Sequence, residues 1–282
     1  MCARWAMAMV AAFVLGLAAP ARAADQLAAL TPGAPAPDYR LSYDIFFGGL
    51  KFSTFDIALG LTEERYRIGI EARTAGALGW FYDWRLEAES EGMVSQDGAV
   101  EAVAHRTTSF WRGGDRSVTI DYAEGAVAEV EVRPPPDEDD REAVPEAELA
   151  DVVDPMSAIV GLLLRAKRDG LCVPEQRIFD GRRRYNAFLA DVPAVELDAA
   201  GYSAYRGPAQ GCALSFERIA GFLNEPRRRV KTDRIVVWVA PVYAGGPPVP
   251  VRLEADSSVG ALRVHLTRAR NGRGELVPGD AD

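Results

Sequence analysis

The sequence predicts a mainly β fold, in which a strongly curved antiparallel sheet or barrel of about a dozen strands surrounds one buried helix at about residues 154–168. Three observations lead to this prediction. Apolar and polar residues alternate in one segment after another, which is typical of half-buried strands. Short glycine-containing turns separate these segments. Only one stretch beyond the N-terminus, Asp154 to Arg165, has the features of a helix.

Residues 1–23 are expected to be a cleaved signal peptide. Arg4 supplies the positive start, Trp5 to Ala19 the apolar run, and Ala21-Arg22-Ala23 the cleavage pattern. The apolar run is shorter than the ~20 residues that cross a bilayer. No cysteine lies at the cleavage point, so the protein is not expected to be a lipoprotein. We therefore expect a soluble periplasmic or secreted protein without a transmembrane anchor after cleavage.

The net charge of the chain is −9, and removal of the signal peptide takes away two arginines and no acidic residue. Proteins that bind the phosphate backbone of nucleic acids need positive charge on the binding face. Nucleic acid is therefore not expected as a partner.

The first strands follow a lead-in at residues 24–38. Apolar residues alternate over Tyr39 to Phe47, and Gly48-Gly49 is a turn signal. In the returning strand, Leu50 to Leu61, the apolar pattern changes phase, which predicts a β-bulge or a sharp bend. Further strands with turns between them predict an antiparallel meander. They are expected at 66–72, 80–88, 99–111, 118–122 and 126–133.

An acidic, proline-rich crossing loop at 134–150 leads into the helix. It lacks the alternating acids and the glycine of a calcium-binding loop. Asp154 is suited to cap the helix, Pro155 to occupy its first turn, and Lys167 and Arg168 to lie at the negative end of its dipole. The helix is apolar around most of its circumference, so it should be buried.

The β pattern resumes after the helix. Asp180-Gly181 predicts a tight hairpin, and the expected strands are 177–180, 184–188, 192–199, 211–220, 232–240, 249–256 and 262–269. The favoured organisation is a single β-rich domain over 39–270 with a tail at 271–282. A two-lobed arrangement, with strands 39–133 and 172–270 on either side of the helix, is the alternative.

Two cysteines, Cys172 and Cys212, remain after signal cleavage. An even pair in an exported protein indicates a disulfide. Two buried thiols that do not meet are the alternative.

Several ordered motifs resemble those of a bacterial domain-of-unknown-function family, the one numbered 3108. They are Tyr43 to Leu50, Thr74-Ala75-Gly76, Asp154 to Ala158, Phe179 to Tyr185, and Val237-Trp238 with Pro250 to Leu253. The resemblance covers nearly the whole mature chain. It implies an exported, envelope-associated protein rich in antiparallel β-structure, and it implies no reaction.

No motif of a catalytic, metal or cofactor site stands out. His105 and His265 are isolated within expected strands and have no ligand spacing. Nucleophile-elbow, phosphate-loop and dinucleotide motifs are missing. No catalytic residue, metal or cofactor is therefore expected.

Two basic clusters stand out in the acidic chain. Arg182, Arg183 and Arg184 form one, and Arg227 and Arg228 belong to the other. Guanidinium groups suit anionic headgroups or glycan phosphates. Solvated charge beside hairpin turns explains the clusters as well.

Aromatic residues on the expected strands are candidates for the lining of a hydrophobic cavity, although core packing explains them too. These residues are Tyr43, Trp80, Tyr82, Trp84, Phe110, Trp111 and Trp238.

The leading hypothesis is a non-catalytic binding or assembly factor of the cell envelope that holds a lipid-like or other amphipathic ligand between sheet and helix. The alternatives are a hydrolase that acts on envelope polysaccharide and a scaffold for an envelope protein partner.

Overall fold

The computed structural model describes residues 35–76, 83–111, 114–135, 142–169, 172, 175–198, 202–223, 232–243, 246–258, 260–272 and 274–276. These residues form a 14-stranded sheet in which all strand pairs are antiparallel, one helix, α3 (Pro155–Asp169), and a short 3₁₀ turn, η5 (Glu146–Glu148). The predicted mainly β class with one helix is confirmed.

The strands before the helix are β1 (Tyr39–Phe47), β2 (Leu50–Leu61), β3 (Arg65–Thr74), β4 (Trp84–Val94), β5 (Val100–Trp111), β6 (Arg116–Ala123) and β7 (Ala126–Arg133). Those after it are β8 (Gln176–Phe179), β9 (Arg184–Leu197), β10 (Gly207–Ala220), β11 (Thr232–Pro241), β12 (Pro248–Ser257), β13 (Gly260–Asn271) and β14 (Gly274–Leu276).

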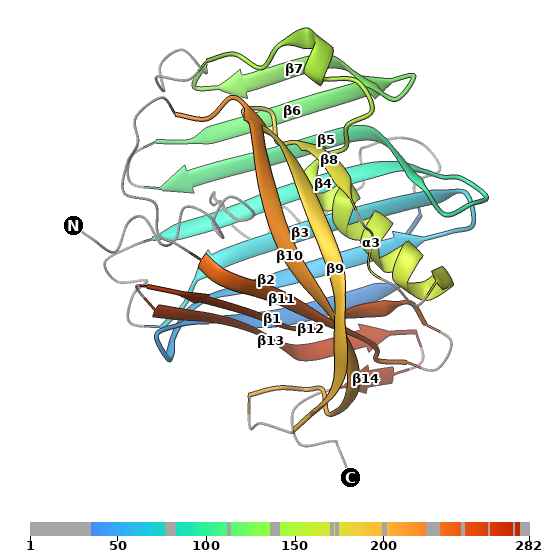
Figure 1. Ribbon diagram of the computed structural model, residues 1–282, viewed down its shortest axis with the longest axis vertical. Helices are drawn as coiled ribbons and strands as arrows, with labels where there is room; N and C mark the ends of the chain where they lie inside the picture. The colour runs from blue at the N-terminus through green and yellow to red at the C-terminus, as the bar shows by residue number, and fades with distance from the viewer. Residues whose placement is uncertain are drawn as a thin grey trace.

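The sheet is a nearly closed curl whose two edges meet a connecting segment. Its order is β7-β6-β5-β4-β3-β2-β1-β13-β12-β11-β10-β9-β8, so β7 and β8 are the edges, and hydrogen bonds between them do not close the sheet within the described part. The amide of Val127 donates to Leu149, and the amide of Phe179 donates to Val153. The segment before α3 therefore links both edges. Figure 1 shows β9 and β10 crossing in front of the wall formed by β1–β6.

The first hairpin forms as its sequence predicts. Gly48 and Gly49 have φ values of 56° and 83°, a left-handed conformation that glycine adopts without steric cost. The β1–β2 register shifts between Ile45 and Phe46, which confirms the predicted bulge in β2. Gly181, with φ 84°, forms the predicted turn between β8 and β9.

Several strand limits differ from the prediction. The strand expected at 80–88 is observed as β4, which begins at Trp84 and continues to Val94. It therefore extends six residues beyond the end that the alternating pattern predicts. The strands expected at 184–188 and 192–199 are one strand, β9, because both halves pair with β10. The sequence pattern also missed β14, which lies in the expected tail and pairs with β13. The expected signal peptide lies outside the described residues.

Helix α3 lies on the concave face of the sheet. Met156, Val160 and Leu163 are at most 4% exposed and belong to the same core as residues of β1–β4 and β11–β13. The helix contacts β3, β4 and β5 on one wall and β12 on the other. The prediction of a buried helix inside a curved sheet is thus confirmed. Among the described helices, none is long and apolar enough to cross a membrane.

Candidate functional site

The concave face has two ends of different character. One end carries the Asp97–Gly98 turn between β4 and β5, and Arg168 near the end of α3 lies beside Gly98. We call this the closed end. The other carries the Gly48–Gly49 turn between β1 and β2, and we call it the open end. In Figure 1, α3 lies at the right of the molecule, toward the closed end.

A buried polar cluster fixes the start of α3. It consists of Tyr66, Ser90, His105, Thr107, Asp154 and Ser157, which come from β3, β4, β5 and the start of the helix.

Asp154 is the centre of the polar cluster and is fully buried. Its Oδ1 accepts hydrogen bonds from the amides of Met156 and Ser157 at 2.9 and 3.0 Å, which confirms its predicted role as helix cap. The same oxygen accepts from Ser90 Oγ at 2.6 Å, and Oδ2 accepts from Ser157 Oγ. A capping residue thereby also ties the helix to β4.

His105 extends the cluster along β5. Its Nδ1 lies 2.8 Å from Ser90 Oγ and 3.2 Å from Asp154 Oδ1, and its Nε2 lies 2.8 Å from Thr107 Oγ1. The only proton of the Ser90 hydroxyl goes to the carboxylate, so Nδ1 is assigned as the donor to Ser90. The sequence pattern predicts that His105 is an ordinary strand residue. Only strand pairing brings it to Ser90, and no spacing in the sequence indicates that contact.

The polar cluster holds Asp154 ionised. Burial by itself raises the pKa of this carboxyl, but His105 and the donors Ser157 and Ser90 outweigh burial and lower it to about 2. Burial raises the pKa of Tyr66, whose hydroxyl donates to Ser157 Oγ at 2.7 Å. The carboxylate is saturated with donors, which suits an anchor better than a catalytic group that must exchange partners.

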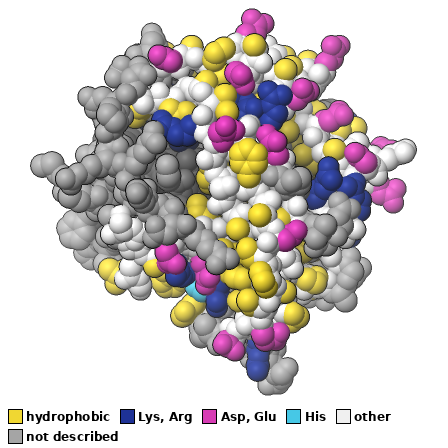
Figure 2. Space-filling view, in the orientation of Figure 1, with side chains coloured by type: hydrophobic (Ala, Val, Ile, Leu, Met, Phe, Trp, Pro, Cys, Tyr) yellow, Lys and Arg dark blue, Asp and Glu magenta, His cyan; other side chains and the backbone are white. Residues whose placement is uncertain are grey.

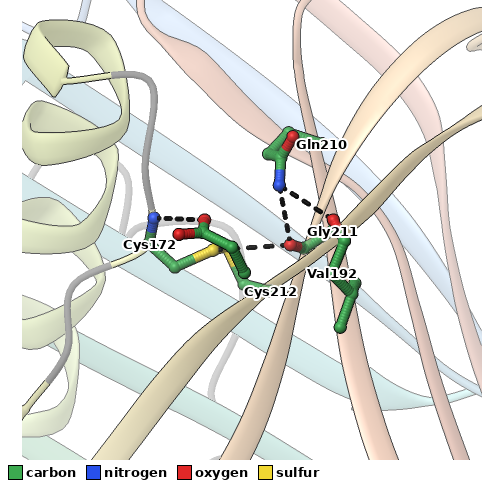
Figure 3. The surroundings of a disulfide bond; sticks show 6 residues. Cys172, Val192, Gln210, Gly211 and Cys212 are labelled. Atoms are coloured by element: carbon green, nitrogen blue, oxygen red, sulfur yellow. Dashed lines mark hydrogen bonds between the residues drawn. A yellow bond between two sulfur atoms is a disulfide. The ribbon is translucent and has the colours of Figure 1, made fainter.

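The other end of α3 is held by a covalent bond. Cys172, three residues beyond the helix, forms the predicted disulfide with Cys212 of β10, and their Cα atoms are 5.8 Å apart. The amide of Cys172 donates to Asp191 Oδ1 at 3.0 Å. Gln210 Nε2 donates to the carbonyls of Val192 and Gly211, as Figure 3 shows. The helix is therefore tied to opposite parts of the sheet at its two ends.

Apolar side chains at the open end are only partly covered. One continuous row crosses four strands in register, from Phe47 through Leu262 and Ala255 to Ile235. The next residue in register, Leu214 of β10, packs against the clusters that contain Leu162 and Ala158 of α3, so it is not part of this row. Residues in register share a face, and Leu262 alternates with the core residues Val264 and Leu266, so this apolar row faces the concave side. Ala255 is buried, whereas the other three are half-buried. The concave face thus presents apolar surface to solvent here.

Two of the predicted aromatic residues lie on the concave face and are buried. Tyr43 stacks on Phe55 with ring centroids 4.6 Å apart, and its hydroxyl donates to the carbonyl of Pro250 at 2.9 Å. Trp84, at the open end of β4, is 3% exposed and belongs to the same core. Both rings pack within the core, as the core-packing interpretation predicts.

Of the remaining aromatic candidates, Trp238 belongs to the same core cluster as these two, and a shared cavity lining stays a prediction. Phe110 pairs with Arg85, so it lies on the opposite face from Trp84. Trp111 is in register with Trp84. Trp238 is in register with Arg252, and its Nε1 donates to Glu254 Oε2 at 3.3 Å. Trp80 and Tyr82 lie outside the described residues.

The indole nitrogen of Trp84 is a buried donor. It has no hydrogen-bond partner in the described part of the chain. Most buried donors in proteins are paired, because an unpaired one has lost its bonds to water without replacement.

The predicted anion-binding arginines of the β8–β9 turn make contacts within the protein. Arg183 Nε donates to Asp180 Oδ2 at 2.7 Å, and Arg182 Nη2 donates to the carbonyl of Pro134. Arg184 is 2% exposed and donates to Glu148 and Asn186. Arg227 and Arg228 lie outside the described residues. Anion contact by these arginines stays a prediction.

His265 lies on the opposite face of β13 from the core. The rings of Tyr202 and Phe46 meet it at 4.7 and 5.9 Å. Burial, together with the charges of Arg252 and Arg263, lowers the pKa of His265 to about 4. The imidazole is therefore neutral near pH 7.

One small cavity opens beside the polar cluster. It measures about 30 Å³ and is lined by Tyr66, Gly92 and Val103 among others. This space accommodates about one water molecule and is far too small for an acyl chain. In the described part of the chain, no three His, Cys, Asp or Glu residues are grouped to hold a metal ion.

Figure 2 shows hydrophobic side chains over β9 and β10 between groups of charged ones. The large exposed hydrophobic residues of these two strands are Val195, Phe216 and Ile219.

The chain matches the model of a family described as "Protein of unknown function (DUF3108)" over residues 39–267. Among solved structures, a β-barrel-like protein of domain-of-unknown-function family DUF1849 from Brucella abortus is similar, with TM-score 0.50 and 12% identity over 84% of this chain and 98% of that chain. A putative lipoprotein from Parabacteroides distasonis has TM-score 0.33 and 8% identity over 83% of this chain and 98% of that chain. No curated protein matches. The likeness to the Brucella protein supports the fold alone.

Proposed function

Since the chain belongs to the DUF3108 family of proteins of unknown function, we propose a function from its own geometry: it is a non-catalytic cell-envelope factor that binds an amphipathic, lipid-like ligand. The observation that carries the proposal is the apolar row at the open end, whose large side chains face the concave side and stay half-buried. An apolar chain laid against them removes this surface from water, which stabilises the complex.

The two anchors of α3 favour a preformed binding surface. The polar cluster holds the start of the helix, and the Cys172–Cys212 disulfide holds the segment beyond its end. A surface on a rigid support loses little conformational entropy when a ligand binds. The ligand is therefore expected at the open end, with the helix in place.

The cellular location belongs to the same proposal. Disulfides persist in the periplasm and outside the cell and are rare in the cytosol. Together with the expected signal peptide, the Cys172–Cys212 bond supports a periplasmic protein that meets envelope lipids. An envelope protein that delivers or receives the ligand is a further expected partner.

The experiment is a fluorescence titration with N-phenyl-1-naphthylamine, a hydrophobic probe that brightens in apolar surroundings. The variant Leu262→Asp places a charge in the apolar row. Loss of one leucine contact is expected to weaken binding roughly tenfold. Val195→Asp is the matched control, because Val195 is also exposed on a strand but lies outside the apolar row.

Both variants are expected to keep the parent's circular dichroism spectrum, since neither replaced side chain is fully buried. Equal affinity of the parent and Leu262→Asp, or equal weakening by the two variants, would contradict binding at the apolar row. An absence of probe binding by the parent protein would contradict the function itself.

A further inference from the structure

We infer that the ligand carries an acceptor oxygen, a carboxylate or ester carbonyl at the polar end of an acyl chain, which accepts a hydrogen bond from Trp84 Nε1. This inference rests on the proposed function and adds the chemical class of the ligand's polar group. It begins from the one indole nitrogen on the described concave wall that is buried without a partner.

Trp84 Nε1 is the indole donor among the buried polar atoms that lack a partner in the described part of the chain, which also include the hydroxyl of Tyr122. Trp84 is 3% exposed, so its Nε1–H has lost contact with water. Trp238, the other tryptophan whose side chain is described, donates to Glu254. A buried N–H that lacks an acceptor destabilises the free protein, and a ligand oxygen in reach removes that penalty. The unbound protein therefore offers a free hydrogen-bond donor, Trp84 Nε1, to an acceptor oxygen of a ligand.

Trp84 lies on the same concave face as the proposed apolar surface, three strand spacings or about 14 Å from the β1 end of the row. Strand pairing places Ser53 opposite Thr74 at the end of β3 and Ile45 opposite Ser53. Because Arg73 pairs with Arg85, Trp84 starts β4 at this same level of the sheet. Ile45 is two residues from Phe47, the first member of the apolar row. The indole is thus one layer further inside the concave face than the row.

Polar groups continue from Trp84 along the same wall. Ser109 and Thr107 face the concave side of β5, because they pair with Leu86 and Ala88 of β4. Thr107 is half-buried, and its hydroxyl is held by His105 Nε2. The β4–β5 wall therefore offers hydrogen-bonding groups, whereas the apolar row across β1 and β11–β13 offers none. This division suits a molecule with one polar and one apolar part.

The chemistry of the donor selects the ligand class. An indole N–H only donates, so it discriminates in favour of oxygen acceptors and against a plain hydrocarbon. Fatty acids and acyl esters combine such an oxygen with an apolar chain. A free carboxylate makes the stronger hydrogen bond because it is charged.

The test compares two probes on one variant. Trp84→Phe keeps an aromatic ring in the core and removes the N–H. Binding of palmitate, measured by calorimetry, is expected to weaken about tenfold, whereas binding of N-phenyl-1-naphthylamine, which has no acceptor oxygen, is expected to change less than about twofold. The melting temperature of the free variant is expected to fall less than that of Trp238→Phe, because both lose the same ring volume but only Trp84→Phe removes an unpaired donor.

Trp238→Phe is the matched control, because it makes the same change where the N–H already has an acceptor. Its affinity for palmitate is expected to equal that of the parent. Unchanged palmitate binding by Trp84→Phe, or an equal loss of both probes with a melting temperature below that of Trp238→Phe, overturns the acceptor inference and leaves the proposed function standing. If the parent binds neither probe, the proposed function fails and this inference fails with it.

Discussion

The closed and open ends of the concave face are built from similar strands but completed differently. At the closed end, α3 covers the sheet, a saturated carboxylate fixes its start, and a disulfide holds the segment after it. At the open end, the apolar row is half-buried and the Trp84 N–H lacks a partner in the described part of the chain. The first arrangement anchors the helix through a saturated carboxylate and a covalent bond, although the hydroxyl of Tyr122 near Asp154 is buried without a partner among the described residues. The second leaves large apolar side chains only partly covered.

This difference indicates a division of roles. Surfaces that are fully packed and fully hydrogen-bonded contribute to stability, because each lost contact has no substitute. Surfaces with unmade contacts contribute less to stability and are available to a ligand. Variants at the closed end should therefore change the free energy of unfolding, and variants at the open end should change binding.

The largest effect on stability is expected from the disulfide. Replacement of Cys172 and Cys212 by serine releases a loop of 40 residues, which in the chain-entropy model lowers the free energy of unfolding by about 4 kcal/mol. Urea unfolding of parent and variant under the same conditions measures it. Probe binding by the fraction that stays folded is expected to persist, because the apolar row does not include the bridge. A loss below about 1 kcal/mol would show that the closed end does not need this tether.

The next effect is expected from the carboxylate that starts α3. Asp154→Asn keeps a capping side chain but removes the charge that pairs with His105, and we expect a loss of about 3 kcal/mol. Asp151→Asn, three residues earlier, is the control, since that side chain is 84% exposed and should change stability by less than about 0.5 kcal/mol. Similar losses in both variants would argue against the polar cluster as the anchor.

The smallest of the three effects is a dependence on acid. The pKa of Asp154 is lowered from 3.8 to about 2 in the folded protein, so its stabilisation is complete above pH 4 and is lost as the pH falls toward 2. The shift corresponds to about 2 kcal/mol. The stability difference between parent and Asp154→Asn should therefore shrink by this amount between pH 5 and pH 2. A difference that is constant with pH would show that the charge of Asp154 does not act in the folded state.

The individual residues of the candidate site were predictable to different degrees. The cap of Asp154 and the Cys172–Cys212 bond follow from local patterns, and both are confirmed. The contact between His105 and Ser90 joins residues 15 positions apart through the β4–β5 register, which includes a shift at Glu91–Gly92. The spacing of residues along the sequence does not predict such a shift in strand register. For the same reason, the sequence grouped Trp84 with Phe110, which the register places on opposite faces.

By itself, the sequence determined most of the strands and their turns and the one buried helix, because these follow from side-chain period and backbone preference over a few residues. It also indicated the cysteine pair, but it missed β14 and divided β9 into two strands. Tertiary structure decided which faces meet. The order of 14 strands, the curl that brings both edges to one segment, and the partly covered apolar row among the described residues depend on pairing between distant strands. The burial and the hydrogen bonds of a side chain depend on residues that are distant in the sequence. Only the folded chain therefore reveals that the buried N–H of Trp84 lacks an acceptor among the described residues.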